Sequence, residues 1–292
     1  MLEEAPVILL AFAAALLYGV SWQVVRLGLG HLDARTAVTV SSGVTALTFL
    51  LVSPLWFNWQ DATNPGILIF AALGFFHPLV SRYLAYEANR RVGATISSTF
   101  ESLSPLLSVA VAIVFLRERP DAFIIAGTML AVAGGVYIYW HPSVSRSLIR
   151  TAMLMALAAM SLRAMNNVVG KVGLDLVPNP MMAAFTAYGV SFLIAISSLK
   201  IAPPQRAIGA SPRGIGWFAA VGVITAVASG CLYGALMMGE VVIVAPILAS
   251  YPVFVMLIGW LLGTEPPNAR NVTGVLAVVI GVTLITARAV QR

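Results

Sequence analysis

Charged residues are scarce in this sequence. Asp, Glu, Lys and Arg make up 10% of its 292 residues, whereas a soluble domain usually carries about 25%. Apolar residues make up 60%, and the mean hydropathy is +0.93. This composition argues against an ordinary soluble domain and predicts an integral membrane protein.

Cysteine and the motifs of common enzymes are nearly absent as well. The single cysteine, Cys231, lies in an apolar run, so an intrachain disulfide or a cysteine cluster is impossible. The sequence contains no Walker loop, no metal-ligand spacing and no nucleophile–base motif. We therefore expect no enzymatic activity, no cofactor and no metal site. The alternative, from another functional class, is an intramembrane enzyme. Such an enzyme would need a midplane cluster of His, Asp or Cys, which the sequence lacks.

The net charge of +6 does not indicate a nucleic-acid partner. Most Lys and Arg residues lie in short loops between apolar runs, where membrane-topology signals are expected. The N-terminus, MLEEAP, is acidic and lacks the basic region of a cleaved signal peptide. We therefore count the first apolar run as a membrane span.

Apolar runs of about 20 residues, the length that crosses a bilayer as a helix, follow one another along the chain. Proline-rich segments such as Pro178-Asn179-Pro180 separate them. The fold class that we predict is an all-α integral membrane protein of the plasma (inner) membrane with ten spans. These are residues 6–29, 36–57, 66–88, 94–116, 121–140, 148–171, 181–200, 214–237, 241–263 and 270–287.

The two halves of the sequence resemble each other. A shift of 147 positions aligns residues 83–138 with 230–285 without a gap and gives eleven identities in 56 positions. Five of the identities fall on prolines, a glutamate and glycines, which apolar similarity alone does not reproduce. We infer an internal duplication, with one five-helix repeat in residues 1–140 and the other in residues 141–292.

An odd number of spans per repeat has a consequence for topology. The second repeat must enter the membrane from the opposite side, so the two repeats are inverted. Inverted repeats are typical of secondary transporters, whose substrate site lies near the midplane between the repeats. The repeat therefore favours a small-solute transporter.

The spacing of residues that recurs in both halves resembles that of a known group of transporters. Each half has a proline in its fourth span, a glutamate 13 residues later, and two glycines seven apart in its last span: Pro105, Glu118, Gly127, Gly134 and Pro252, Glu265, Gly274, Gly281. The chain thereby resembles the drug/metabolite transporter superfamily, in particular its ten-span EamA-like members, and more loosely the aromatic amino acid exporters. One departure is Arg163, at a position where the family tends to place an aromatic residue.

The resemblance implies export of amino acids or similar small metabolites by alternating access, without ATP hydrolysis. The alternative within transport is translocation of lipid-linked or sugar-conjugated metabolites, which would need a lateral opening to lipid. The partners that we expect are a small-molecule substrate and the lipid bilayer. We take a monomer as the working oligomeric state, which the sequence leaves open.

Four ionisable residues lie within predicted spans, where such groups usually face a cavity or a partner: His77, Arg82, Glu101 and Arg163. Arg82 and Glu101 lie about 10 Å from the same membrane face, so they could form an ion pair. Arg163 lies about 22 Å from that face, too deep for Glu101, and could bind a substrate carboxylate. Glu101 could instead carry a proton, and His77 could cap carbonyls freed by Pro78.

Other side chains could line the central cavity. The aromatic candidates are Tyr18, Phe76, Tyr86, Tyr233 and Tyr251, and the polar candidates are Ser104, Asn167 and Ser250. The alternative for the aromatic residues is packing between helices. The serines could equally bond the backbone of their own helices.

The charges in the loops and the resemblance disagree on orientation. The odd-numbered loops hold ten Lys and Arg residues near span ends, and the even-numbered loops and termini hold five. The positive-inside rule then places both termini outside. The resemblance places them in the cytoplasm.

Overall fold

The computed structural model describes residues 4–88, 104–139, 146–201, 211–248, 250–261 and 269–290. All regular secondary structure in these residues is helical. The first half contains α1 (Glu4–Gly28), α2 (Ala34–Leu51), η1 (Ser53–Leu55), α3 (Trp59–Thr63), α4 (Ile67–Gly74), η2 (Phe75–Val80), α6 (Ser104–Val111), η3 (Ala112–Leu116) and α7 (Ala122–Tyr139). The second contains α8 (Arg146–Leu176), α9 (Pro180–Ile201), α10 (Pro212–Met238), α11 (Val241–Leu248), α12 (Tyr251–Leu261) and α13 (Ala269–Val290).

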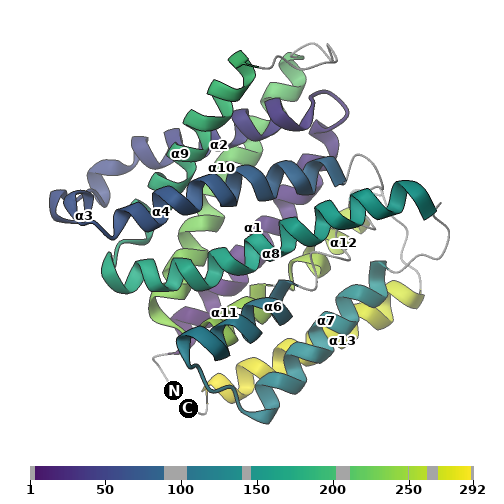
Figure 1. Cartoon of the computed structure of the whole chain (residues 1–292). Helices are drawn as coiled ribbons and strands as arrows, with labels where there is room; N and C mark the ends of the chain where they lie inside the picture. Colours follow the sequence, from purple (N-terminus) through teal and green to yellow (C-terminus); the bar gives the residue numbers. More distant parts are fainter. Residues whose placement is uncertain are drawn as a thin grey trace.

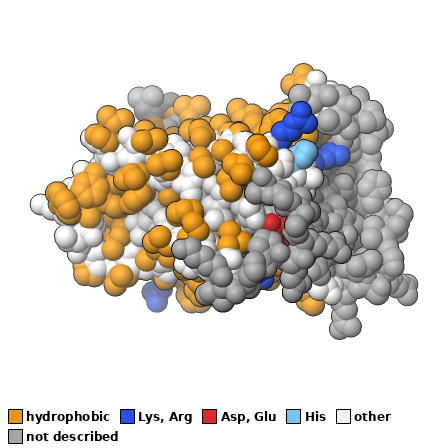
Figure 2. Space-filling view, turned by 90° about the horizontal axis from the view of Figure 1, so that it is seen from above, with side chains coloured by type: hydrophobic (Ala, Val, Ile, Leu, Met, Phe, Trp, Pro, Cys, Tyr) orange, Lys and Arg blue, Asp and Glu red, His pale blue; other side chains and the backbone are white. Residues whose placement is uncertain are grey.

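Much of the predicted membrane character is confirmed. Six helices of the described chain are long and apolar enough to cross a membrane: Ala5–Gly28, Ala34–Leu51, Ile67–Ala88, Pro180–Leu199, Pro212–Met238 and Val241–Leu261. Shorter apolar helices cover Leu106–Leu116, Ala122–Gly134 and Val272–Ile285. Apolar side chains also cover much of the described surface in Figure 2. A count of ten spans stays a prediction.

Two predicted boundaries were wrong. The second span was placed at 36–57, but α2 ends at Leu51 and the short helices η1 and α3 follow. Pro54 lies in the first turn of η1, where its missing N–H prevents continuation of α2. The sixth span was placed at 148–171, but α8 continues to Leu176, because no helix breaker precedes Pro178.

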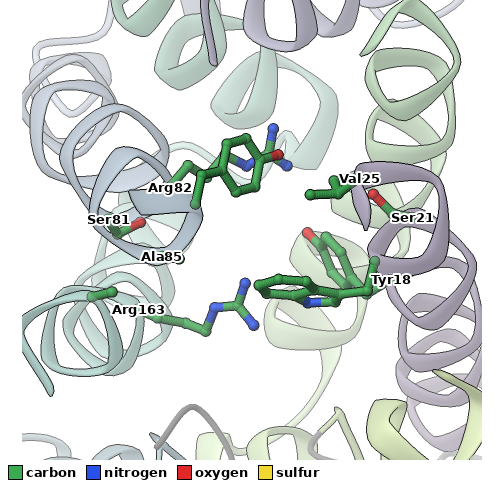
Figure 3. A pocket seen from close by; sticks show the side chains of 10 residues that line it. Tyr18, Ser21, Val25, Ser81, Arg82, Ala85 and Arg163 are labelled. Carbon is green, nitrogen blue, oxygen red and sulfur yellow. The ribbon is translucent and has the colours of Figure 1, made fainter. Parts of the chain in front are cut away.

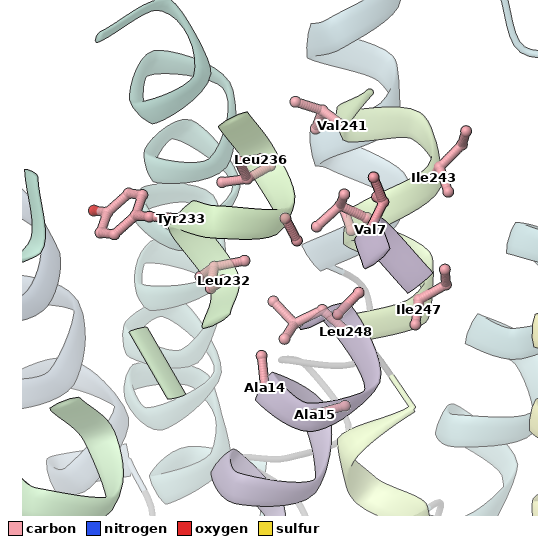
Figure 4. Packing of buried hydrophobic residues seen from close by; sticks show 14 of the residues in the cluster. Val7, Ala14, Ala15, Leu232, Tyr233, Leu236, Val241, Ile243, Ile247 and Leu248 are labelled. Carbon is pink, nitrogen blue, oxygen red and sulfur yellow. The ribbon is translucent and has the colours of Figure 1, made fainter. Parts of the chain in front are cut away.

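Long helices pack side by side along most of the bundle (Figure 1). α1 packs against α10 and α12, α2 against α9 and α10, and α4 against α8 and α9. In the buried core, α1 residues such as Val7 meet α10 and α11, including Leu236 and Ile243 (Figure 4). All eight residues of α11 are buried, so this helix lies at the centre of the packing.

Glycines bring α7 and α13 close together. A Cβ atom added to Gly127 would lie 2.6 Å from the Gly281 carbonyl oxygen, and one added to Gly134 would lie 2.6 Å from that of Gly274. Both distances are too short for any side chain, so only glycine permits this approach. The four glycines that drew attention in the sequence therefore form one antiparallel helix seam (Figure 1).

A carboxylate of the first half holds a helix end of the second. Glu118, between η3 and α7, accepts hydrogen bonds from the N–H groups of Val241 (3.0 Å) and Val242 (2.9 Å). These N–H groups begin α11 and have no partner within their own helix. The structure thus gives Glu118 a capping role. Glu265, its counterpart in the repeat, lies outside the described residues.

Candidate functional site

A polar pocket lies between α1, the helical residues 81–88 and α8 (Figure 3). Its lining consists of Tyr18, Ser21, Trp22, Val25, Ser81, Arg82, Ala85, Tyr86, Ala159 and Arg163. Its free volume is about 30 Å³, which is room for about two water molecules. Among the described residues, the lining contains two guanidinium groups and no carboxylate, so its chemistry suits an anionic ligand group.

Arg82 is the more deeply buried of the two cations, with 8% of its surface exposed. Its Nη2 donates to the hydroxyl oxygens of Thr225 (3.1 Å) and Tyr188 (3.4 Å). Its guanidinium carbon also lies 5.2 Å from the centre of the Tyr188 ring, a cation–π distance. Nη1 has no hydrogen-bond partner among the described residues. A buried donor without a partner costs roughly 1–3 kcal/mol, so this N–H group is suited to a ligand.

Arg82 was expected to pair with Glu101. Glu101 lies outside the described residues, so that pair and the proton-carrier role of Glu101 stay predictions. The partners that the structure does describe, Tyr188 and Thr225, were not among the predicted site residues.

Hydroxyl groups continue the network from Arg82 towards α1. The Ser229 Oγ lies 2.9 Å from the Tyr188 hydroxyl and 3.1 Å from the Tyr18 hydroxyl. These residues belong to α10, α9 and α1, so three helices meet at one chain of hydrogen bonds. The signal that could have found Tyr188 and Ser229 is their position mid-span, because a polar side chain buried there must find a partner.

Arg163 enters the pocket from α8 and faces α1 (Figure 3). Its guanidinium carbon lies 6.0 Å from the centre of the Tyr18 ring and 5.9 Å from that of Tyr251. Both are cation–π distances, and such contacts contribute about 2 kcal/mol or more where water is excluded. The aromatic residues Tyr18 and Tyr251 thus surround a cation that an apolar membrane span would otherwise disfavour.

The segment that contains His77 lies close to the pocket but does not line it. The His77 backbone leaves the helical conformation (φ −138°, ψ 121°) before Pro78, which interrupts the span at this point. The buried His77 ring bonds through Nδ1 to the Ser81 Oγ at 2.5 Å. Phe76 is 48% exposed and packs edge-on against Phe75, so its ring also lies outside the pocket lining.

The two tyrosines Tyr86 and Tyr233 both make contacts between helices. Tyr86 lines the pocket and packs against Phe218 of α10. The Tyr233 hydroxyl donates to Asn166 Oδ1 of α8 (3.0 Å) and its ring packs on Phe70.

Asn167 joins α8 to α6, because its Nδ2 donates to the Ser108 Oγ at 3.3 Å. Its Oδ1 has no partner among the described residues. Ser250 donates to the Ile247 carbonyl at 2.7 Å, the backbone bond that was the alternative to a cavity role. Ser104 is buried at the start of α6. The structure therefore brings Tyr18, Tyr86, Arg82 and Arg163 together in one pocket. Asn167, Ser250 and Ser104 do not line it.

Comparison with known proteins places this architecture in a family. The model of the EamA-like transporter family matches residues 5–140 and again residues 150–287. A search of curated proteins finds no match. One crystal structure of another protein has a TM-score of 0.82 and 14% sequence identity, and the alignment covers 98% of each chain. An identity this low supports the fold alone. The two family matches cover nearly the whole chain, so the protein belongs to the EamA-like transporter family and is a multi-pass membrane transporter of a solute.

Proposed function

We propose that this protein exports amino acids or similar small carboxylate metabolites across the plasma membrane by alternating access. In this proposal the substrate carboxylate binds in the pocket between α1, residues 81–88 and α8. Arg163 anchors the carboxylate, and Arg82 offers its Nη1 to the same group. The Tyr18 ring beside Arg163 forms part of the wall of the pocket.

The observation that carries the proposal is the presence of two guanidinium groups in a pocket to which no described residue contributes a carboxylate. A guanidinium binds a carboxylate through two parallel hydrogen bonds, which is stronger and more directional than contact with an ammonium group. Arg82 adds a buried N–H group that has no partner among the described residues. An incoming carboxylate would supply an acceptor for this N–H group of Arg82.

The small size of the pocket supports a mechanism with a conformational change. About 30 Å³ is too little for an amino acid, because one water molecule already needs roughly 10–15 Å³ by this measure. A substrate can therefore enter only if the helices around the pocket separate. Alternating access, in which one repeat rocks against the other around a fixed site, provides such an opening.

The inverted relation of residues 1–140 and 141–292 is part of the proposal. Gly127 and Gly134 of α7 correspond to Gly274 and Gly281 of α13 in the duplicated sequence. A two-fold axis between the repeats would convert the contact of Gly127 with Gly281 into a contact of Gly274 with Gly134. Both contacts occur, which supports a two-fold relation.

Transport from reconstituted vesicles tests the proposed function. Purified protein in liposomes is loaded with labelled amino acids, and efflux is measured for wild type, Arg163→Lys and Arg163→Gln. We expect Arg163→Gln to weaken apparent substrate affinity at least about ten-fold, which corresponds to one lost charge-assisted contact. Arg163→Lys keeps the charge but loses the planar fork, so its defect should be smaller.

The matched control is Arg213→Gln, which removes an exposed arginine at the start of α10. This variant should transport like wild type. Thermal unfolding with and without each amino acid separates a binding defect from misfolding. If a folded Arg163→Gln protein exports every carboxylate substrate at the wild-type rate, the anchor role is wrong.

A further inference from the structure

A second cavity, which we call the lateral groove, lies between α2, the segment 79–83 and α9. Its volume is about 350 Å³, more than ten times that of the central pocket. Its walls are mainly apolar and include Val38, Leu79, Val80 and Ala195. A cavity of this size and polarity inside a membrane protein suits a hydrocarbon chain better than a polar solute.

One end of the lateral groove carries a positive charge. Arg35, an exposed residue in the first turn of α2, belongs to its lining. Because α2 is long and apolar enough to cross the membrane, its first turn lies near a membrane face, at the depth of lipid headgroups. Asp33 lies two residues earlier and caps the helix, because its carboxylate accepts hydrogen bonds from the backbone N–H groups of Arg35 and Thr36.

The groove opens along helices whose outer surfaces are apolar. Leu79, Val80 and Tyr83 are each partly exposed, and in α9 the neighbouring Leu193 is 63% exposed. In a membrane, apolar surface of this kind faces lipid chains. The groove therefore combines an apolar interior, access from the hydrocarbon region and a cation at headgroup depth.

The lateral groove and the central pocket lie on different faces of the same segment, residues 79–86. Leu79, Val80 and Tyr83 line the groove, whereas Arg82 and its neighbours Ser81, Ala85 and Tyr86 line the pocket. Helical geometry explains the division, because positions three and four apart share a face. The same segment follows the interruption of the helix at His77. Anything that fills the groove therefore supports the wall that carries Arg82.

We propose that the lateral groove binds an anionic phospholipid of the surrounding bilayer. One acyl chain fills the apolar interior, and the lipid phosphate lies at Arg35. The bound lipid holds the segment 79–86 against α1 and so stabilises the central pocket. The odd-numbered loops, which precede α2 and follow α9, hold most of the Lys and Arg residues near span ends, and such a face attracts anionic lipids. This lipid site is independent of which solute the protein carries.

Thermal unfolding of the full-length protein in detergent tests the proposal. The probes are phosphatidylglycerol and phosphatidylcholine with identical acyl chains. We expect phosphatidylglycerol to raise the unfolding temperature at about five-fold lower concentration than phosphatidylcholine, the factor expected for one cation near a headgroup that carries a net negative charge. Arg35→Gln should abolish this preference, and Arg213→Gln, an exposed arginine outside the groove, should keep it.

A plug variant tests the chain-binding part of the groove. Ser198→Phe places a ring in the lining and should reduce the response to both lipids. Equal responses of the wild type to both lipids would overturn the proposal. So would a preference that survives in Arg35→Gln or is lost equally in Arg213→Gln, because either result assigns the effect to general surface charge.

A direct measurement does not depend on any variant. Phosphatidylglycerol with a photoreactive group in its acyl chain is bound to the wild type, irradiated, and the modified peptides are identified by mass spectrometry. We expect modification of the segments 79–83 and 195–198. Modification confined to other helices would show that the lipid binds elsewhere, and the groove assignment would then be wrong.

Discussion

Replacement of Gly281 by alanine tests the close contact of α7 with α13. The added Cβ would lie 2.5 Å from the Gly127 carbonyl oxygen and 2.6 Å from the Ala131 backbone nitrogen. Both neighbours are backbone atoms, so no side-chain rotation can relieve the overlap. α7 must move away by most of an ångström, and overpacking of this kind typically costs about 1–3 kcal/mol.

A matched control exists for the helix-forming effect of alanine itself. Gly189 in α9 has no atom within 4 Å of an added Cβ. Gly189→Ala should therefore be neutral or stabilise the protein by up to about 1 kcal/mol, because alanine favours helix. Gly134→Ala, which meets the Gly274 carbonyl across the same seam, should behave like Gly281→Ala.

The assay is thermal unfolding of purified protein in detergent, followed by size-exclusion chromatography to detect aggregation. We expect a lower unfolding temperature for Gly281→Ala and Gly134→Ala and an unchanged or higher one for Gly189→Ala. If Gly281→Ala unfolds at the same temperature as Gly189→Ala, the contact of α7 with α13 is looser than the structure shows. The reasoning on the glycine seam would then be refuted.

Further predictions follow from single hydrogen bonds. Glu118→Ala removes the cap of α11 and should destabilise the protein by about 1–2 kcal/mol, measured as a lower unfolding temperature; an unchanged temperature would contradict the capping role. Ser229→Ala breaks the hydrogen-bonded link between Tyr18 and Tyr188 and should lower the free energy of unfolding by about 0.6 kcal/mol, the average for such bonds in membranes. If transport is lost while the protein stays folded, the link takes part in the transport mechanism. Tyr233→Phe keeps the ring but loses the bond to α8, so it should change stability by a similar amount and leave substrate affinity unchanged in the vesicle assay.

The helices could be predicted from the sequence because their physical cause is local. Runs of apolar residues and the prolines between them determine where a chain can cross a membrane, and most predicted spans contain a described helix. The errors arose at positions such as Pro54 and Leu176, where hydropathy and helix-breaking residues disagree. Gly127 and Gly281 stood out in the sequence as members of a repeated pattern, but the contact between the two helices that contain them came only from the structure.

The pocket could be predicted only in part, because it depends on which helices meet. Arg82 and Arg163 stood out as cations within apolar spans, and both line the pocket. Tyr188 did not stand out, because a tyrosine in a membrane helix has many uses and its role here comes from contact with a residue of a distant span. Phe76 was an aromatic candidate for the cavity, but its ring is largely exposed and lies outside the pocket lining.

The hydrogen bonds of Glu118 have a consequence for biosynthesis. The carboxylate and its partner Val241 are separated by 123 positions, so the ribosome releases Glu118 long before α11 exists. During that interval the carboxylate has no helix end to bind, and the first half cannot reach its final arrangement. The cap of α11 therefore forms only after α11 has been synthesised, and a translation stop after residue 140 would leave a fragment that lacks these hydrogen bonds.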